Sequence, residues 1–175
     1  PKLIPCDPMA PSAVKDTSTD IIPREMTVDE ILMIRDAFIE AVRRGRDAGF
    51  DAVQLHVAHG YLLSQFISPY TNRRTDDYGG STENRPRIIV DIQRKARELV
   101  GRDFPILAKL NIIDGIEGGL TIDESEKVAR ILADNTVDAI EISGGIAEAG
   151  SVAAQAKIDS QDKEAYFFQY AERIK

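Results

Sequence analysis

Three short apolar segments alternate with amphipathic helical patterns along this chain, and this alternation restricts its fold more than any other feature. The strand candidates span residues 50–56, 104–110 and 137–142, and each follows a stretch with helical spacing. Because strands joined by helices enter a sheet from the same end, they must run parallel. The sequence therefore predicts the order αβαβαβα, an α/β fold with parallel strands.

Helix boundaries are marked by local signals. Thr27 and Glu30 have the spacing of a capping box, in which the hydroxyl and the carboxylate each accept a backbone N–H bond, and Thr121 and Glu124 repeat it. Glycines follow the first two helical patterns, as is typical of helix ends. These signals predict helices over 27–49, 81–101, 121–134 and 163–174.

The rest of the chain carries weaker signals. Residues 1–26 hold five of the eight prolines and indicate an extended lead-in, whereas residues 27–175 carry the α/β units. Residues 57–82 read as a long irregular segment. We interpret residues 1–175 as belonging to one domain.

Composition excludes several classes of protein. Acidic residues outnumber basic ones by 29 to 22, which argues against a nucleic-acid binder. No apolar run of about 18 residues occurs, so we expect no membrane span. The single Cys6 can form neither an internal disulfide nor a metal site, and we expect it to be inert. These features, with no signal peptide at the start, favour a cytoplasmic globular protein.

Alternation within the strands separates polar from apolar side chains. Because successive side chains point to opposite faces, one face collects the apolar residues, which suit packing against helices. We expect Lys109 on the polar face either to pair with Glu141 or to face an anionic ligand, because an unpaired buried charge is costly. The polar set comprises Gln54, His56, Lys109, Asn111, Glu141 and Ser143.

The only two histidines, His56 and His59, lie three residues apart, and Tyr61 follows. His56 falls at the carboxyl end of a predicted parallel strand, where α/β folds build their sites. Two imidazoles and a phenol there could hold a substrate carbonyl and deliver a proton. The alternative is that His56 ends the strand and Tyr61 only packs. The H-x-x-H spacing is weak evidence for zinc, and we predict no metal site.

Two glycine-containing loops allow a functional or a structural interpretation. The loop over residues 72–80 would either form a lid over a substrate or act as a scaffold, with Arg73 or Arg74 bridging Asp76 or Asp77, and we favour the scaffold. The pair at residues 144–145 would either admit a ligand close to the backbone or form a plain turn.

One long motif covers residues 56–85. It reads HVAHGYLL at 56–63, continues with QF at 65–66 and SP at 68–69, and ends with YGG at 78–80 and ENR at 83–85. Shorter segments fit in order: APS at 10–12, KLN at 109–111 and ISGG at 142–145. Together these segments resemble the old yellow enzyme family, which includes the FMN-dependent ene-reductases, NADH:flavin oxidoreductases and 2,4-dienoyl-CoA reductases.

The resemblance implies an FMN-dependent oxidoreductase that uses NADH or NADPH to reduce small activated alkenes, such as α,β-unsaturated carbonyls or enoyl and dienoyl thioesters. By resemblance, His56 and His59 bind and polarise the substrate carbonyl and Tyr61 protonates the α-carbon. Lys109 would lie against the polar edge of FMN. The sequence does not choose between NADH and NADPH.

The resemblance also implies a TIM (β/α)8 barrel, which needs about 250 residues. The three predicted strands correspond to about strands 4 to 6 of such a barrel. We therefore expect the chain to be the central part of one FMN-binding domain, inactive alone, with either self-association or the remainder of the barrel completing it. Two alternatives stay open: a non-catalytic half-barrel that acts as an assembly module, and a TIM-barrel aldolase that forms a Schiff base at Lys109.

Overall fold

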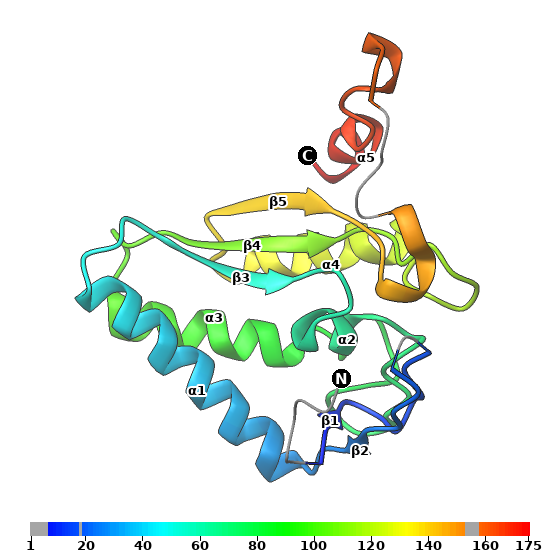
Figure 1. Cartoon of the computed structure of the whole chain (residues 1–175). Helices are drawn as coiled ribbons and strands as arrows, with labels where there is room; N and C mark the ends of the chain where they lie inside the picture. Colours follow the sequence, from blue (N-terminus) through cyan, green and yellow to red (C-terminus); the bar gives the residue numbers. More distant parts are fainter. Residues whose placement is uncertain (1–6, 18, 153–157) are drawn as a thin grey trace.

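A three-stranded parallel sheet forms the centre of the molecule (Figure 1). In this computed structural model, which describes residues 7–17, 19–152 and 158–175, the sheet order is β3 (Val53–Val57), β4 (Ile106–Asn111) and β5 (Ala139–Ser143). Both strand pairs are parallel, which confirms the predicted α/β fold. Each strand begins two or three residues later than its sequence pattern suggested.

Three long helices separate and cover the strands. They are α1 (Val28–Asp47), α3 (Arg87–Val100) and α4 (Ile122–Asp134). Both predicted capping boxes form, at Thr27 before α1 and at Thr121 before α4. The start of α3 was predicted too early, because residues 81–86 form a turn in which the Ser81 carbonyl oxygen accepts bonds from two later amides.

Other short elements were predicted wrongly or missed. Helix α2 (Leu62–Ile67) lies inside the segment expected to be irregular, and it buries Leu63, Phe66 and Ile67. The last helix, α5 (Phe168–Ile174), is shorter than predicted because a separate turn of 3₁₀ helix, η2 (Gln161–Lys163), precedes it and Ala165 has a φ of 49°. Another 3₁₀ segment, η1 (Ala147–Val152), follows β5.

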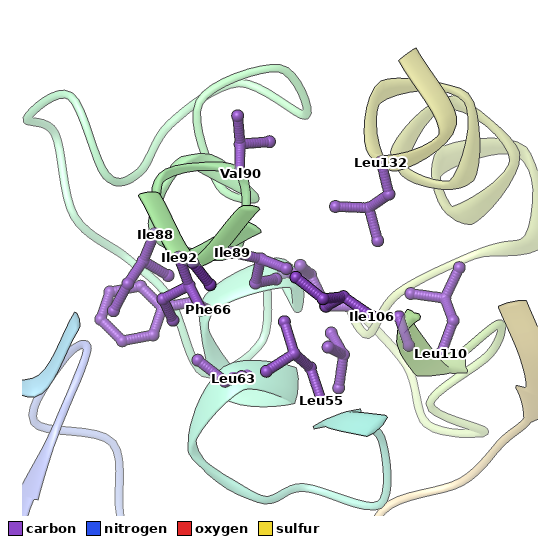
Figure 2. Packing of buried hydrophobic residues seen from close by; sticks show 14 of the residues in the cluster. Leu55, Leu63, Phe66, Ile88, Ile89, Val90, Ile92, Ile106, Leu110 and Leu132 are labelled. Atoms are coloured by element: carbon purple, nitrogen blue, oxygen red, sulfur yellow. The ribbon is translucent and has the colours of Figure 1, made fainter. Parts of the chain in front are cut away.

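The core fills the space between the helices and one face of the sheet (Figure 2). Leu55, Ile106 and Leu110 point from the strands toward Ile89 of α3 and Leu132 of α4. These side chains are at most 4% exposed. The apolar face predicted from strand alternation is therefore the helix-covered face, and apolar burial holds the sheet in place.

The buried guanidinium of Arg74 links the N-terminal lead-in to the loop over residues 72–80. The short strands of the lead-in, β1 (Met9–Ala10) and β2 (Arg24–Glu25), pair in parallel. Arg74, whose side chain is 5% exposed, donates to the carbonyl oxygens of Pro11 and Met26 at 3.0 and 2.6 Å. It also pairs with Asp76 at 2.5 Å. These contacts confirm the scaffold interpretation of the loop over residues 72–80.

No helix in the described part of the chain is both long enough and apolar enough to cross a membrane.

We predict that Arg74→Ala lowers the free energy of unfolding by about 3 kcal/mol, because it leaves the carbonyl oxygens of Pro11 and Met26 without this donor and the Asp76 carboxylate without its cation. Urea denaturation followed by circular dichroism measures this change. Arg43→Ala is the matched control: Arg43 also pairs with a carboxylate at 2.5 Å, but its side chain is 40% exposed. Its loss should change stability little, and equal effects of the two variants would contradict the anchoring role.

Candidate functional site

The register of the parallel strands brings the predicted site residues together on the polar face of the sheet. His56 of β3 lies opposite Lys109 of β4, and Lys109 lies opposite Glu141 of β5. One row of side chains therefore crosses all three strands. Because the neighbouring positions on each strand point to the helices, this row stands on the other face.

An ion pair occupies the middle of this row. The Lys109 ammonium lies 2.8 Å from one oxygen of Glu141, and the Gln54 amide donates to the other oxygen at 2.9 Å. The Lys109 bond lowers the pKa of Glu141, and the Gln54 bond lowers it further. The predicted Lys109–Glu141 pair is confirmed. An ammonium has three N–H donors, so Lys109 retains donors for a ligand on this face.

The three aromatic side chains predicted to act together form one cluster. The rings of His56 and Tyr61 have centroids 4.8 Å apart, and those of His56 and His59 are 5.2 Å apart. Tyr61 stands at the N-terminal end of α2 and is 62% exposed. The Tyr61 side chain therefore does not fill the core, and its ring lies beside that of His56.

His59 is held in an unusual backbone conformation. Its φ of 63° is uncommon for a residue with a side chain, and Gly60 continues in the same region at 76°. The His59 amide donates to the Asn111 side-chain oxygen at 3.4 Å, and the His59 Nε2 atom lies 2.5 Å from the Ser143 hydroxyl. The ends of β4 and β5 therefore fix both the backbone and the ring of His59.

Behind this cluster lies a buried carboxylate that the sequence analysis missed. Asp114 accepts bonds from the Ser68 hydroxyl at 2.6 Å and from the Asn111 amide and the Leu120 backbone N–H at 2.7 Å. Burial raises the pKa of Asp114, while these three bonds oppose that effect. The only local signal was an acidic residue three positions after Asn111, which did not reveal its distant partners.

Both imidazoles have a pKa below the ordinary 6.5. Burial is the largest cause for each ring, because it disfavours the charged form. The positive charge of Lys109 lowers the pKa of both rings further, and for His59 the neighbouring His56 has a larger effect than Lys109. The two rings are therefore neutral at pH 7, in the form that can donate one hydrogen bond and accept another.

A cavity of about 280 Å³ lies beside His59 and Gly60. It is enclosed by the lead-in, by residues that follow β3 and by the start of η1. Its apolar walls include Met9, Ile21 and Ile146, and its polar walls include Lys15 and Glu148. A mixed lining of this kind suits a small organic molecule with a polar group.

The glycines after β5 form a close-packed turn. Gly145 has a φ of 85°, and its N–H donates to Ile113 at 2.6 Å. A Cβ atom added to Gly144 would lie 3.2 Å from the Phe167 ring, so the Phe167 side chain packs closely against this backbone.

Cys6 lies outside the described residues. Among those that are described, no group of three or more His, Cys, Asp or Glu side chains could hold a metal ion.

Comparisons with known proteins match most of the chain. The model of the NADH:flavin oxidoreductase / NADH oxidase family matches residues 3–173. The chain is 43% identical to an NADH oxidase of Thermoanaerobacter brockii over 81% of its own length and 22% of the relative. It is 41% identical to an NADPH dehydrogenase of Clostridium acetobutylicum, with 82% and 42% covered. The chain thus spans less than half the length of these curated relatives.

Solved structures show the same partial match. A 2-naphthoyl-CoA reductase in complex with 2-naphthoyl-CoA superposes with a TM-score of 0.85 at 33% identity, covering 96% of this chain and 25% of that one. The old yellow enzyme homologue of Zymomonas mobilis gives 0.69 at 30% identity, covering 79% and 42%. Old yellow enzymes are TIM barrels, so the fold is part of a (β/α)8 barrel, as predicted.

We predict that both histidines titrate below pH 6.5. The unfolded chain then binds more protons than the folded chain as the pH falls, so the two rings contribute stability above pH 6.5 that is lost as the pH drops through their folded pKa values. NMR of the ring Cε1 protons measures both titrations. Lys109→Met should raise both pKa values, because it removes a nearby positive charge and leaves Glu141 unpaired. Titration at or above 6.5 in the unmodified chain would contradict this account.

Proposed function

The chain belongs to the NADH:flavin oxidoreductase / NADH oxidase family, and we propose that it carries the substrate-polarising part of an FMN-dependent oxidoreductase that reduces activated alkenes with NADH or NADPH. The observation that carries this proposal is the cluster of His56, His59 and Tyr61 beside Lys109 on one sheet face. We also propose that the protein works in the cytoplasm, where both nicotinamide cofactors are available.

Lys109 gives the polar face of the sheet a hydrogen-bond donor of the kind that the flavin edge accepts. The polar edge of the flavin ring presents carbonyl oxygens and an unprotonated ring nitrogen, which accept hydrogen bonds and gain negative charge on reduction. The Lys109 ammonium pairs with one oxygen of Glu141, which leaves it further N–H donors, and 27% of the Lys109 side chain is exposed. We assign Lys109 to this edge of FMN. When bound, FMN supplies the hydride that the β-carbon of the alkene receives.

The two imidazoles bind and polarise the substrate carbonyl. Each neutral ring can donate one N–H bond to the carbonyl oxygen, and the two ring centroids are 5.2 Å apart on the same sheet face. These bonds stabilise the negative charge that develops on the oxygen as the β-carbon accepts hydride. The His59 ring is positioned before the substrate binds, because Asn111 holds its backbone amide and Ser143 holds its Nε2 atom.

Tyr61 completes the reduction as the acid. Addition of hydride at the β-carbon leaves an enolate, and the Tyr61 hydroxyl gives its proton to the α-carbon. The phenolate that forms regains a proton from water, which the exposure of Tyr61 allows. One hydride and one proton are thus added across the double bond, and the carbonyl is restored.

The substrate class extends to thioesters of coenzyme A. The 2-naphthoyl-CoA reductase, which superposes over 96% of this chain, forms a complex with 2-naphthoyl-CoA. A thioester carbonyl accepts hydrogen bonds from the same two imidazoles as a ketone. The cavity beside His59 provides a mixed surface for the body of such a substrate.

The aldolase alternative is disfavoured by the ion pair on the sheet. A Schiff-base lysine attacks as the neutral amine, which a hydrophobic pocket or a neighbouring cation favours. The Lys109 Nζ atom is instead paired with the Glu141 carboxylate at 2.8 Å. Lys109 is therefore better suited to hold a negative group than to attack a carbonyl.

The outer strands of the sheet imply a larger assembly. Within the described residues β3 and β5 each have a strand neighbour on one side only. An open edge has unpaired backbone groups that favour pairing with further strands. We propose that residues 1–175 are the central part of one barrel domain, completed by further chain or by a second copy, and that they do not turn over alone.

We predict that Tyr61→Phe slows alkene reduction by about 10²–10⁴-fold in a complete, FMN-loaded barrel that contains these residues. Stopped-flow absorbance of the flavin follows its reoxidation by a cyclic enone. Reoxidation by dioxygen, which needs no proton on carbon, is the control and should keep its rate. An unchanged rate with the enone would contradict the role of Tyr61, and equal losses with both oxidants would indicate a damaged flavin site instead.

A further inference from the structure

The Ser143 hydroxyl makes one hydrogen bond within the described residues, to the ring of His59. Ser143 ends β5, is 5% exposed, and its backbone oxygen accepts a bond from the Ile112 amide at 2.9 Å. Its side-chain oxygen lies 2.5 Å from the His59 Nε2 atom. The strand thus fixes the serine, and the serine reaches one nitrogen of the imidazole.

The direction of this hydrogen bond follows from where the hydroxyl proton can go. Ser143 has one O–H proton, and among the described residues no acceptor other than His59 Nε2 lies within hydrogen-bond reach of it. If Nε2 donated instead, the buried hydroxyl proton would lack an acceptor, which is unfavourable. The hydroxyl therefore donates to Nε2, and the proton of the neutral ring lies on Nδ1.

The surroundings of His59 keep the ring in this contact. Its backbone is held in the left-handed region, with its amide on the Asn111 side-chain oxygen. Asn111 is oriented by the buried Asp114 carboxylate at 2.7 Å, and Asp114 also binds Ser68 at the end of α2. The His59 backbone is therefore fixed relative to β4 and β5, which keeps its ring within reach of Ser143.

We propose that Ser143 is a positioning residue that holds His59 in the Nδ1–H tautomer, so that Nδ1–H is the donor offered to the substrate carbonyl. No protein acceptor binds Nδ1 of His59 within the described residues, which leaves this donor to a ligand. The assignment of the ligand as a carbonyl rests on the proposed function, whereas the tautomer itself does not.

Nitrogen NMR of the ¹⁵N-labelled chain tests the proposal, because the two ring nitrogens of a neutral imidazole have different shifts when protonated and unprotonated. The chain has only His56 and His59, so two rings account for every imidazole signal. At a pH above both pKa values, we expect His59 to be the Nδ1–H tautomer, although a free imidazole side chain prefers Nε2–H. Ser143→Ala should return His59 to mostly Nε2–H, and Ser143→Thr should retain Nδ1–H.

Controls separate this effect from a general loss of structure. Ser125→Ala removes another buried hydroxyl, one that donates to Ile112 at 2.7 Å, and should leave the tautomer of His59 unchanged. The spectrum of the unmodified chain decides the matter even if Ser143→Ala fails to fold. A His59 ring that is mostly Nε2–H in the unmodified chain, or one that keeps Nδ1–H in folded Ser143→Ala, would overturn the proposal. Neither result depends on FMN or on alkene reduction, so failure of the proposed function would be seen separately.

Discussion

The in-register pairing of three parallel strands is the constraint on which the rest of this structure depends. Because side chains alternate along each strand, one choice of register sends the apolar residues to the helices and sets His56, Lys109 and Glu141 in a row. A shift by one residue in any strand would bury the charges and expose the core. The same packing that stabilises the fold therefore also assembles the candidate site.

A second constraint is the buried carboxylate of Asp114, which connects segments distant in sequence. Its three donors come from the end of α2, from the end of β4 and from the loop before α4. Since Tyr61 is the N-cap of α2 and Ser68 is its C-cap, the Asp114 network holds the end of the short helix that follows the two histidines. Burial of Asp114 is unfavourable for a charge, and its three donors compensate for part of this cost.

The sequence predicted the features that depend on closely spaced residues or on strand alternation. The capping boxes at Thr27 and Thr121 need only residues three positions apart, and strand alternation placed Lys109 beside Glu141. Helix α2 was missed because six residues are too few to show a helical period, and the start of α3 was misplaced because a turn precedes it. Asp114 was missed because its partner Ser68 is distant in sequence, so no local pattern reveals their contact.

Chemical-shift mapping of FMN on the ¹⁵N-labelled chain tests most directly whether the polar sheet face is the flavin and substrate site, since NMR detects even weak binding. We expect FMN to move the signals of His56 and Lys109 at concentrations that leave the helix-covered face unchanged. Lys109→Met should abolish these shifts, whereas Lys95→Met, which removes an exposed lysine from α3, should preserve them. Shifts confined to the helices, or equal losses in both variants, would contradict the account.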